Sequence, residues 1–206
     1  RKLKGLSRAD SVAIDPHKWF YAPIEAGCTL VRNKQQMIDA FSYRPPYYNF
    51  KGEGSDEPVN FYEYGLQNTR GFKALKVWLA FKQIGREGFQ KLIQQDIDLA
   101  KILFDEVSVN PELEALMHEL SIVTFRYVPT EIKGDDEKQQ EYLNNLNQKI
   151  LNRVQKEGEA FVSNALINGK FLLRACIVNF RTREEHIKLL ASIVTRVGRE
   201  THSQKK

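Results

Sequence analysis

The fold of this chain is indicated by one stretch, Ser11-Val12-Ala13-Ile14-Asp15-Pro16-His17-Lys18-Trp19. Its first four residues predict a short buried strand, which ends at Asp15-Pro16 because proline has no N–H to give to a ladder. A second strand of β-rich composition is expected over residues 27–32. The loop between the two strands therefore carries His17 and Lys18, followed by the aromatic residues Trp19, Phe20 and Tyr21.

Lys18 allows two interpretations. A lysine in a turn between strands is most often a solvated surface charge. Its aromatic neighbours would instead remove it partly from water, and desolvation favours the neutral amine, which is the nucleophile in Schiff-base chemistry. His17 also allows two interpretations. Composition alone favours a structural histidine with satisfied hydrogen bonds over a functional one.

The rest of the chain predicts helices followed by an α+β unit. Helical spacing runs from Thr69 to Ile84, where Gly85 stops it, and a longer helix follows as far as Val107. Thr182 and Glu185 predict a capping box that opens the last helix. Between them we expect an antiparallel sheet covered on one face by helices, with a domain boundary near residue 105, so that the domains are 1–105 and 106–206. The predicted elements of this unit are a strand over 120–128, a helix over 135–156 and strands over 160–167 and 170–178.

Residues 42–65 are rich in aromatic side chains and are punctuated by proline and glycine, including Phe50, Gly52, Gly54 and Pro58. Proline and glycine exclude a long helix there, and the aromatic density argues against a disordered linker. Such a segment either covers a site or an interface, or packs on its own domain. The sequence leaves both alternatives open.

Composition excludes several classes of function. The 206 residues are 42% hydrophobic and 28% charged, which is ordinary for a soluble globular protein. The net charge of +5 is dispersed among acidic residues, so we expect no nucleic-acid partner. The basic residues at the two ends, Arg1, Lys2, Lys4, Lys205 and Lys206, are expected to fray. The two cysteines form no CxxC or Cys/His cluster, so no metal is expected. Without a signal segment or a long apolar run, we expect no membrane partner and a cytoplasmic location.

The stretch 11–19 resembles the cofactor-lysine signature of the group II decarboxylases that depend on pyridoxal 5′-phosphate (PLP). Residues 43–48 resemble the loop that follows the lysine strands in that family. Gln67-Asn68-Thr69-Arg70, with Phe72 and residues 74–78, is similar to the family's arginine-containing start of the helix that leaves the large domain. Residues 120–129 and 171–176 resemble strands of its C-terminal domain. The resemblance covers essentially the whole chain and is closest to the aromatic-L-amino-acid decarboxylase subgroup.

This resemblance implies an α/β fold of the fold-type I PLP-dependent transferase kind. The chain would hold the end of the large domain and then a small α+β C-terminal domain with an antiparallel sheet. Lys18 would bind PLP as a Schiff base, His17 would lie beside the cofactor near its phosphate, and Asp15 would belong to the cofactor-binding set. Thr69, at a helix N-terminus, would face the phosphate bound by the partner subunit. The family works as homodimers with the active site at the interface.

Three departures from the family pattern bear on activity. The carboxylate that holds the pyridinium nitrogen, the ring-stacking histidine and the first phosphate-binding residues lie upstream in the family, so this chain alone is expected to be inactive without the missing N-terminal portion. Arg70-Gly71 stands where the family often has two arginines. Phe61 aligns with the loop tyrosine that protonates the substrate carbon in decarboxylases, although Tyr62 would take that catalytic role after a shift of one residue.

The leading hypothesis is decarboxylation of an L-amino acid, with aromatic substrates favoured, to the amine and CO2 after the substrate amine displaces Lys18. The first alternative is PLP-dependent synthesis of an aromatic aldehyde, because phenylalanine at the position of Phe61 accompanies that outcome in related enzymes. The second alternative is a non-catalytic fragment, because the upstream half of the site is missing.

Overall fold

The computed structural model describes residues 3–48, 59–132, 134 and 136–204. The expected fraying of Arg1, Lys2, Lys205 and Lys206, and the predictions that concern Phe50, Gly52, Gly54 and Pro58, lie outside these described residues. Lys4 is described, in a turn, and its fraying stays a prediction. The chain divides into two compact units, an N-terminal unit of residues 1–86 and a C-terminal unit of residues 87–206. The domain boundary near residue 105 stays a prediction about the complete enzyme.

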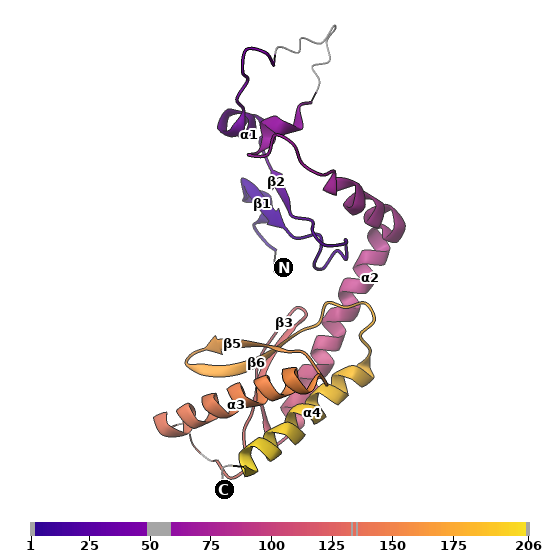
Figure 1. Cartoon of the computed structure of the whole chain (residues 1–206). Coiled ribbons are helices and arrows are strands. Elements are labelled where there is room, and N and C mark those ends of the chain that lie inside the picture. The colour runs from indigo at the N-terminus through magenta and orange to yellow at the C-terminus, as the bar shows by residue number, and fades with distance from the viewer. Residues whose placement is uncertain (1–2, 49–58, 133, 135, 205–206) are drawn as a thin grey trace. The chain divides into compact units, whose positions relative to one another are not determined.

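The N-terminal unit is built on a two-stranded antiparallel ribbon, which confirms both predicted strands (Figure 1). Ser11 pairs with Val31 and Ile14 with Cys28. The sequence analysis missed the helix α1, which begins after Asn33, whose side chain accepts a hydrogen bond from the N–H of Gln35. The described elements here are η1 (Leu6–Arg8), β1 (Ser11–Ile14), β2 (Cys28–Val31), α1 (Lys34–Phe41) and η2 (Phe61–Tyr64).

The first strand is less buried than predicted. Exposed and half-buried residues alternate along β1, and Leu30 in the middle of β2 is 55% exposed. A ribbon of two strands has two faces to cover, and such a pair does not bury an apolar core by itself. The prediction of a buried strand is therefore wrong for the chain as it stands, because the described residues do not cover both faces of the ribbon.

The long helix α2 (Lys73–Val109) is interrupted at Gly85, as the sequence predicts. Gly85 has φ of 70° and ψ of 169°, a conformation that glycine adopts without the steric cost of a side chain. The helix begins four residues later than expected, at Lys73 rather than Thr69. Gly71 lies between them, and glycine is a poor helix former.

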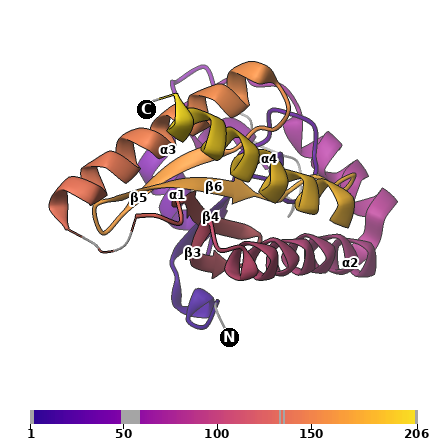
Figure 2. The same ribbon diagram turned by 90° about the horizontal axis from the view of Figure 1, so that it is seen from below.

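The C-terminal unit is the expected α+β unit, with an extra strand. Its four strands are antiparallel in the order β3-β4-β6-β5, and α3 and α4 lie side by side on one face of the sheet (Figure 2). The sequence analysis missed β3, because Leu113–Glu119 lacks the β-branched residues typical of strands. The elements are β3 (Leu113–Glu119), β4 (Ile122–Tyr127), α3 (Glu137–Glu157), β5 (Ser163–Ile167), β6 (Lys170–Cys176) and α4 (Glu184–Ser203).

The ends of the helices follow capping rules, with one correction. Asp136 caps α3 by accepting a hydrogen bond from the N–H of Gln139 at 2.9 Å, and Gly158 ends that helix in the left-handed conformation. The prediction that Thr182 forms the capping box of α4 is wrong. The cap is one residue later, because the N–H of Arg183 donates to Nδ1 of His186 at 3.1 Å.

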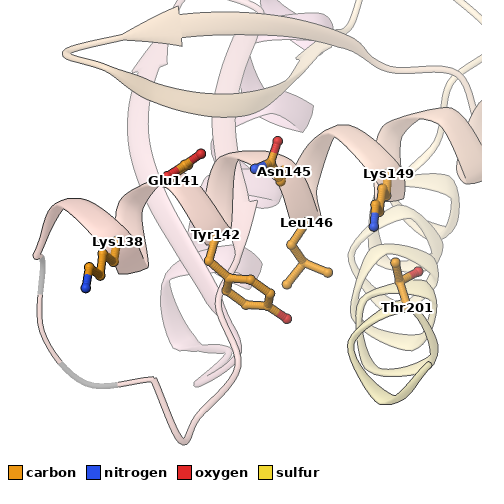
Figure 3. A pocket seen from close by; sticks show the side chains of 7 residues that line it. All are labelled: Lys138, Glu141, Tyr142, Asn145, Leu146, Lys149 and Thr201. Atoms are coloured by element: carbon orange, nitrogen blue, oxygen red, sulfur yellow. The ribbon is translucent and has the colours of Figure 1, made fainter. Parts of the chain in front are cut away.

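One core joins the sheet to its helices. The second half of α2 contributes Leu103 and Val107, and both are fully buried with Phe125 of β4 and Val194 of α4. A hollow of about 280 Å³ remains beside this core, between α3 and the end of α4 (Figure 3). Tyr142 lines it, and the hydroxyl of Tyr142 lies 2.6 Å from Nδ1 of His202.

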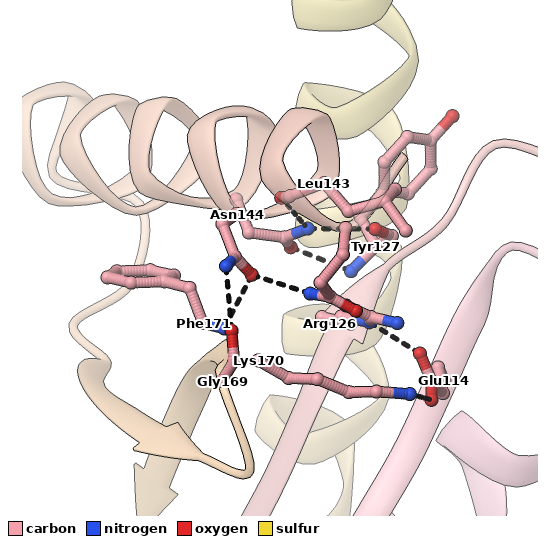
Figure 4. A network of polar contacts seen from close by, with 10 residues as sticks. Glu114, Arg126, Tyr127, Leu143, Asn144, Gly169, Lys170 and Phe171 are labelled. Carbon is pink, nitrogen blue, oxygen red and sulfur yellow. Dashed lines mark hydrogen bonds and ion pairs between the residues drawn. The ribbon is translucent and has the colours of Figure 1, made fainter. Parts of the chain in front are cut away.

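A polar network ties β3 and β4 to the start of β6 and to α3 (Figure 4). The buried guanidinium of Arg126 pairs with Glu114 and donates to Gln140 at 3.1 Å. Lys170 donates to the same Glu114 carboxylate at 3.0 Å. Burial raises the pKa of Glu114, but Lys170 and Arg126 outweigh it, so the net pKa lies below its ordinary value. Glu114 therefore stays ionised between two cations.

This shift predicts an acid-sensitive C-terminal unit. Because the folded pKa of Glu114 is depressed, its contribution to stability is fully present above the unfolded pKa of about 4.3 and is lost as pH falls through the folded pKa. We expect amide exchange in β4 of the complete enzyme, corrected for intrinsic rates, to accelerate as pH falls below about 4.3. Glu114→Gln should flatten that rise and Glu141→Gln, at an exposed site on α3, should not; equal pH profiles for the wild type and Glu114→Gln would contradict the prediction.

Candidate active site

Lys18 lies in a tight turn that begins where β1 ends. The N–H of Lys18 donates to the carbonyl of Asp15 at 2.9 Å, and the N–H of Tyr21 donates to the carbonyl of Lys18 at 3.2 Å. The N–H of Ala22 then returns to the carbonyl of Pro16 at 3.0 Å. These backbone bonds fix the turn from residue 15 to residue 22, so Asp15, His17 and Lys18 are brought together as the sequence predicts.

The amine of Lys18 is exposed and held by a carboxylate. Its side chain is 67% exposed, and Nζ lies 2.6 Å from Oδ2 of Asp15. The hydrogen bond from Lys18 holds the pKa of Asp15 below its usual value, so Asp15 is a carboxylate and the pair is ionic. This exposure shows that the expected desolvation of Lys18 by its aromatic neighbours is wrong for this chain. One of those neighbours, Phe20, packs on Phe81 of α2, with ring centroids 5.5 Å apart.

His17 is fixed by the far end of the same loop. Its Nδ1 lies 2.8 Å from the carbonyl oxygen of Ala26 and 3.2 Å from the N–H nitrogen of that residue. The shorter contact is a hydrogen bond only when Nδ1 carries the proton, and in the neutral ring Nε2 then carries the lone pair. The imidazole is thus half-buried and oriented by backbone, which suits a structural histidine and also a side chain that presents Nε2 to a ligand.

In the described part of the aromatic segment, Phe61 and Tyr62 have different surroundings. The ring of Tyr62 packs on the ring of Tyr48, with centroids 5.4 Å apart, and Asn68 donates to the Tyr48 hydroxyl at 3.2 Å. Phe61 is 68% exposed. Within the described residues, the segment therefore packs in part on its own unit through Tyr62, while Phe61 points outward.

Thr69 is exposed and does not occupy the helix N-terminus that was expected for it, because α2 begins at Lys73. Among the described residues, neither Thr69 nor Tyr62 makes a hydrogen bond, ion pair or ring contact with the Lys18 turn. The structure therefore brings together Asp15, His17 and Lys18 and leaves the other two predicted site residues apart from them.

The sequence analysis missed a buried carboxylate in η2. Glu63 is 3% exposed and is paired with Arg44, which lies on the other side of the undescribed residues 49–58. A signal for it existed, since an acidic residue enclosed by Phe61, Tyr62 and Tyr64 in an apolar one-turn helix needs a cation. The hollow beside α3, in contrast, contains none of the predicted site residues (Figure 3).

The donor set of the Lys18 turn fits an aldehyde cofactor that carries a phosphate. A primary amine is the group that condenses with an aldehyde, and the Lys18 amine is accessible. An imidazole oriented by backbone and lying next to that lysine in the chain suits an anionic phosphate when it is protonated. Among the described residues, no group of three or more His, Cys, Asp or Glu side chains is arranged to hold a metal ion.

The comparison with known protein families shows to which family the chain belongs. The profile of the "Pyridoxal-dependent decarboxylase conserved domain" matches residues 1–128, and so includes the Lys18 turn. The chain belongs to this family of pyridoxal-dependent decarboxylases. This confirms the predicted resemblance, the enzyme class of the family and its pyridoxal cofactor.

Individual relatives agree with this family. The chain is 35% identical over 193 residues to an aromatic-L-amino-acid decarboxylase of Bacillus atrophaeus, and the match covers 93% of this chain and 39% of the relative. It is also 29% identical to a phenylacetaldehyde synthase of Arabidopsis thaliana, with 90% of this chain and 37% of that enzyme covered. The chain thus spans about two fifths of the length of these relatives.

Solved structures of members of this family confirm the predicted fold class. An Oryza sativa TDC structure with PLP and tryptamine matches with a TM-score of 0.83 and 25% identity, covering 96% of this chain and 40% of that one. A Rhodiola rosea 4-hydroxyphenylacetaldehyde synthase matches with a TM-score of 0.74 and 19% identity, covering 98% and 38%, and so shows the fold alone. None of the helices in the described ranges is long and apolar enough to cross a membrane.

Proposed function

We propose that this chain forms part of an enzyme that decarboxylates an aromatic L-amino acid to its amine and CO2, with PLP bonded to Lys18. The observation that supports this assignment most directly is the accessible Lys18 amine, held by Asp15 next to the oriented His17, in a member of the decarboxylase family. The relative from Bacillus atrophaeus supports aromatic substrates.

Each residue of the turn has a separate task. Asp15 holds Nζ of Lys18 in position, and because the pKa of Asp15 is lowered, it is a poor acceptor for the lysine proton near neutral pH. His17, whose ring is oriented by the backbone of Ala26, would donate from Nε2 to an anionic group of the cofactor when the imidazole is protonated. When bound, PLP supplies the electron sink that makes loss of CO2 possible. Nζ of Lys18 would hold the cofactor and, as an amine within the site, would take up and release a proton.

The remaining parts of the proposal concern the complete enzyme. It acts as a homodimer in the cytoplasm with its active site at the interface, and Thr69 faces the phosphate bound by the partner subunit. The N-terminal portion supplies the groups that this chain lacks. Large exposed side chains directly before α2 and on its first half support a covering structure there, since Phe72, Trp78 and Leu79 are each more than half exposed.

A second candidate function is synthesis of the aromatic aldehyde. The exposure of Phe61 favours it, because Phe61 points outward where the family's loop tyrosine aligns, while Tyr62 packs on Tyr48. Aldehyde synthases are also among the relatives. In that reaction O2 and water are consumed with the amino acid, and aldehyde, CO2, ammonia and H2O2 are released.

Product analysis separates the two functions. We expect the complete enzyme, loaded with PLP, to turn over L-tryptophan, L-tyrosine or L-phenylalanine and to leave L-glutamate unchanged. One amine per CO2 without peroxide supports decarboxylation, whereas one aldehyde and one peroxide per CO2 supports the second candidate. Release of no CO2 from any aromatic amino acid would overturn both.

A further inference from the structure

The buried carboxylate of Glu63 is held by three donors. Arg44 binds it as a fork, with Nε 2.5 Å from Oε1 and an Nη donating to Oε2 at 3.1 Å. The hydroxyl of Ser42 donates to Oε1 at 2.9 Å. We call Ser42, Arg44 and Glu63 the Glu63 clamp. Fork-shaped, charge-assisted pairs of this kind are among the stronger hydrogen bonds in proteins and fix the geometry of both partners.

The Glu63 clamp joins two parts of the chain. Ser42 is the residue directly after α1, and Glu63 lies in η2, which packs against α1. Arg44 lowers the pKa of Glu63, and its effect outweighs the opposing effect of burial. Glu63 is therefore ionised while it is buried, and such a charge is tolerated only when its partner is in place.

The clamp also sets the rotation of η2. A 3₁₀-helix has about three residues per turn, so successive side chains point about 120° apart. With Glu63 directed at Arg44, Tyr62 meets Tyr48 and Phe61 is left exposed, as observed. A rotation of η2 that exposed Tyr62 instead would pull Glu63 away from Arg44.

We propose that the Glu63 clamp is a positioning device that presents Phe61 rather than Tyr62 on the outer side of η2, and so determines which aromatic side chain meets the bound substrate. Its second half rests on the second candidate function proposed above, the synthesis of the aldehyde, because only there does the identity of that side chain decide between amine and aldehyde. Arg44 and Glu63 act through η2 and do not touch the reacting atoms.

Nitration of Tyr62 by tetranitromethane tests the first half. In the complete enzyme without cofactor, we expect Tyr62 to react about tenfold faster in Arg44→Ala, because losing a charge-assisted pair shifts the equilibrium of η2 by at least that factor. Arg44→Lys, which keeps the charge but not the fork, should give an intermediate rate. Asp39→Asn, a charge change of the same size and opposite sign at an exposed position of α1, should leave the rate unchanged.

Tyr127 reports whether the C-terminal unit of each variant is folded, because it is 2% exposed and should stay unreactive. If Tyr127 becomes reactive in Arg44→Ala, that variant is unfolded, and the nitration rate of Tyr62 in Arg44→Lys is used for the test instead. Wild-type nitration of Tyr62 in a folded Arg44 variant would overturn the clamp, whatever reaction the enzyme catalyses.

Product ratios test the second half. With PLP and an aromatic amino acid, we expect Arg44→Ala to raise the ratio of amine to aldehyde, in the direction that Phe61→Tyr also moves it. Faster nitration of Tyr62 with an unchanged product ratio would show that the clamp does not determine the product. Failure of the proposed function would leave the nitration result standing, so the two failures are distinguishable.

Discussion

Lys18→Ala in the complete enzyme is expected to lower kcat with an aromatic amino acid by at least about 10³-fold, the order of loss found when a group that acts covalently is removed. The physical reason is that no described side chain beside it supplies another primary amine: the turn places Asp15 and His17 there. Steady-state CO2 release measures the loss.

Borohydride reduction provides a readout that does not depend on turnover. It fixes the cofactor to the amine with which it has condensed, so peptide mass spectrometry should find the added mass on the peptide that contains Lys18. Lys34→Ala, at an exposed lysine of α1, is the matched control and should keep both the label and the activity. A label on another lysine in the wild type, or an unchanged label in Lys18→Ala, would remove Lys18 from its proposed role.

The fold could be predicted where local sequence rules suffice. Gly85 interrupts α2 because glycine tolerates its backbone angles, and Asp136 caps α3 because its side chain accepts an N–H. β3 could not be found in this way. Its residues have little β-propensity of their own, and it becomes a strand through pairing with β4, from Leu113 opposite Tyr127 to Glu119 opposite Ile122.

The candidate site could be predicted only in part, for the same reason. The Lys18 turn is a local structure, and its neighbours in the sequence are its neighbours in space. The desolvation of Lys18 depends in part on where the ring of Phe20 lies, and that ring packs on Phe81, which is far away in the sequence. The Glu63 clamp likewise depends on Arg44, which is far from Glu63 in the sequence. The length and aromatic content of the segment between them do not indicate that these two residues pair.

Two asparagines of α3 replace ladder hydrogen bonds where β4 and β6 separate (Figure 4). The paired register of these strands ends at Phe125 opposite Leu173. Beyond it, Asn147 accepts from the N–H of Tyr127 at 2.8 Å and donates to its carbonyl at 2.9 Å. On the β6 side, Asn144 accepts from the N–H of Phe171 at 2.7 Å. The helix thus satisfies backbone groups that the sheet leaves unpaired.

Asn147→Leu is therefore expected to destabilise the C-terminal unit by about 3–5 kcal/mol, since it leaves both backbone groups of Tyr127 buried without their partner. Asn147 is fully buried, so water cannot replace the amide. Asn144→Leu should cost less, because that side chain is only half-buried, and Asn145→Leu, exposed on the same helix, should cost little. Amide exchange of β4 in the complete enzyme measures these differences. If Asn147→Leu and Asn145→Leu changed the exchange equally, the asparagine would be filling space rather than completing the sheet.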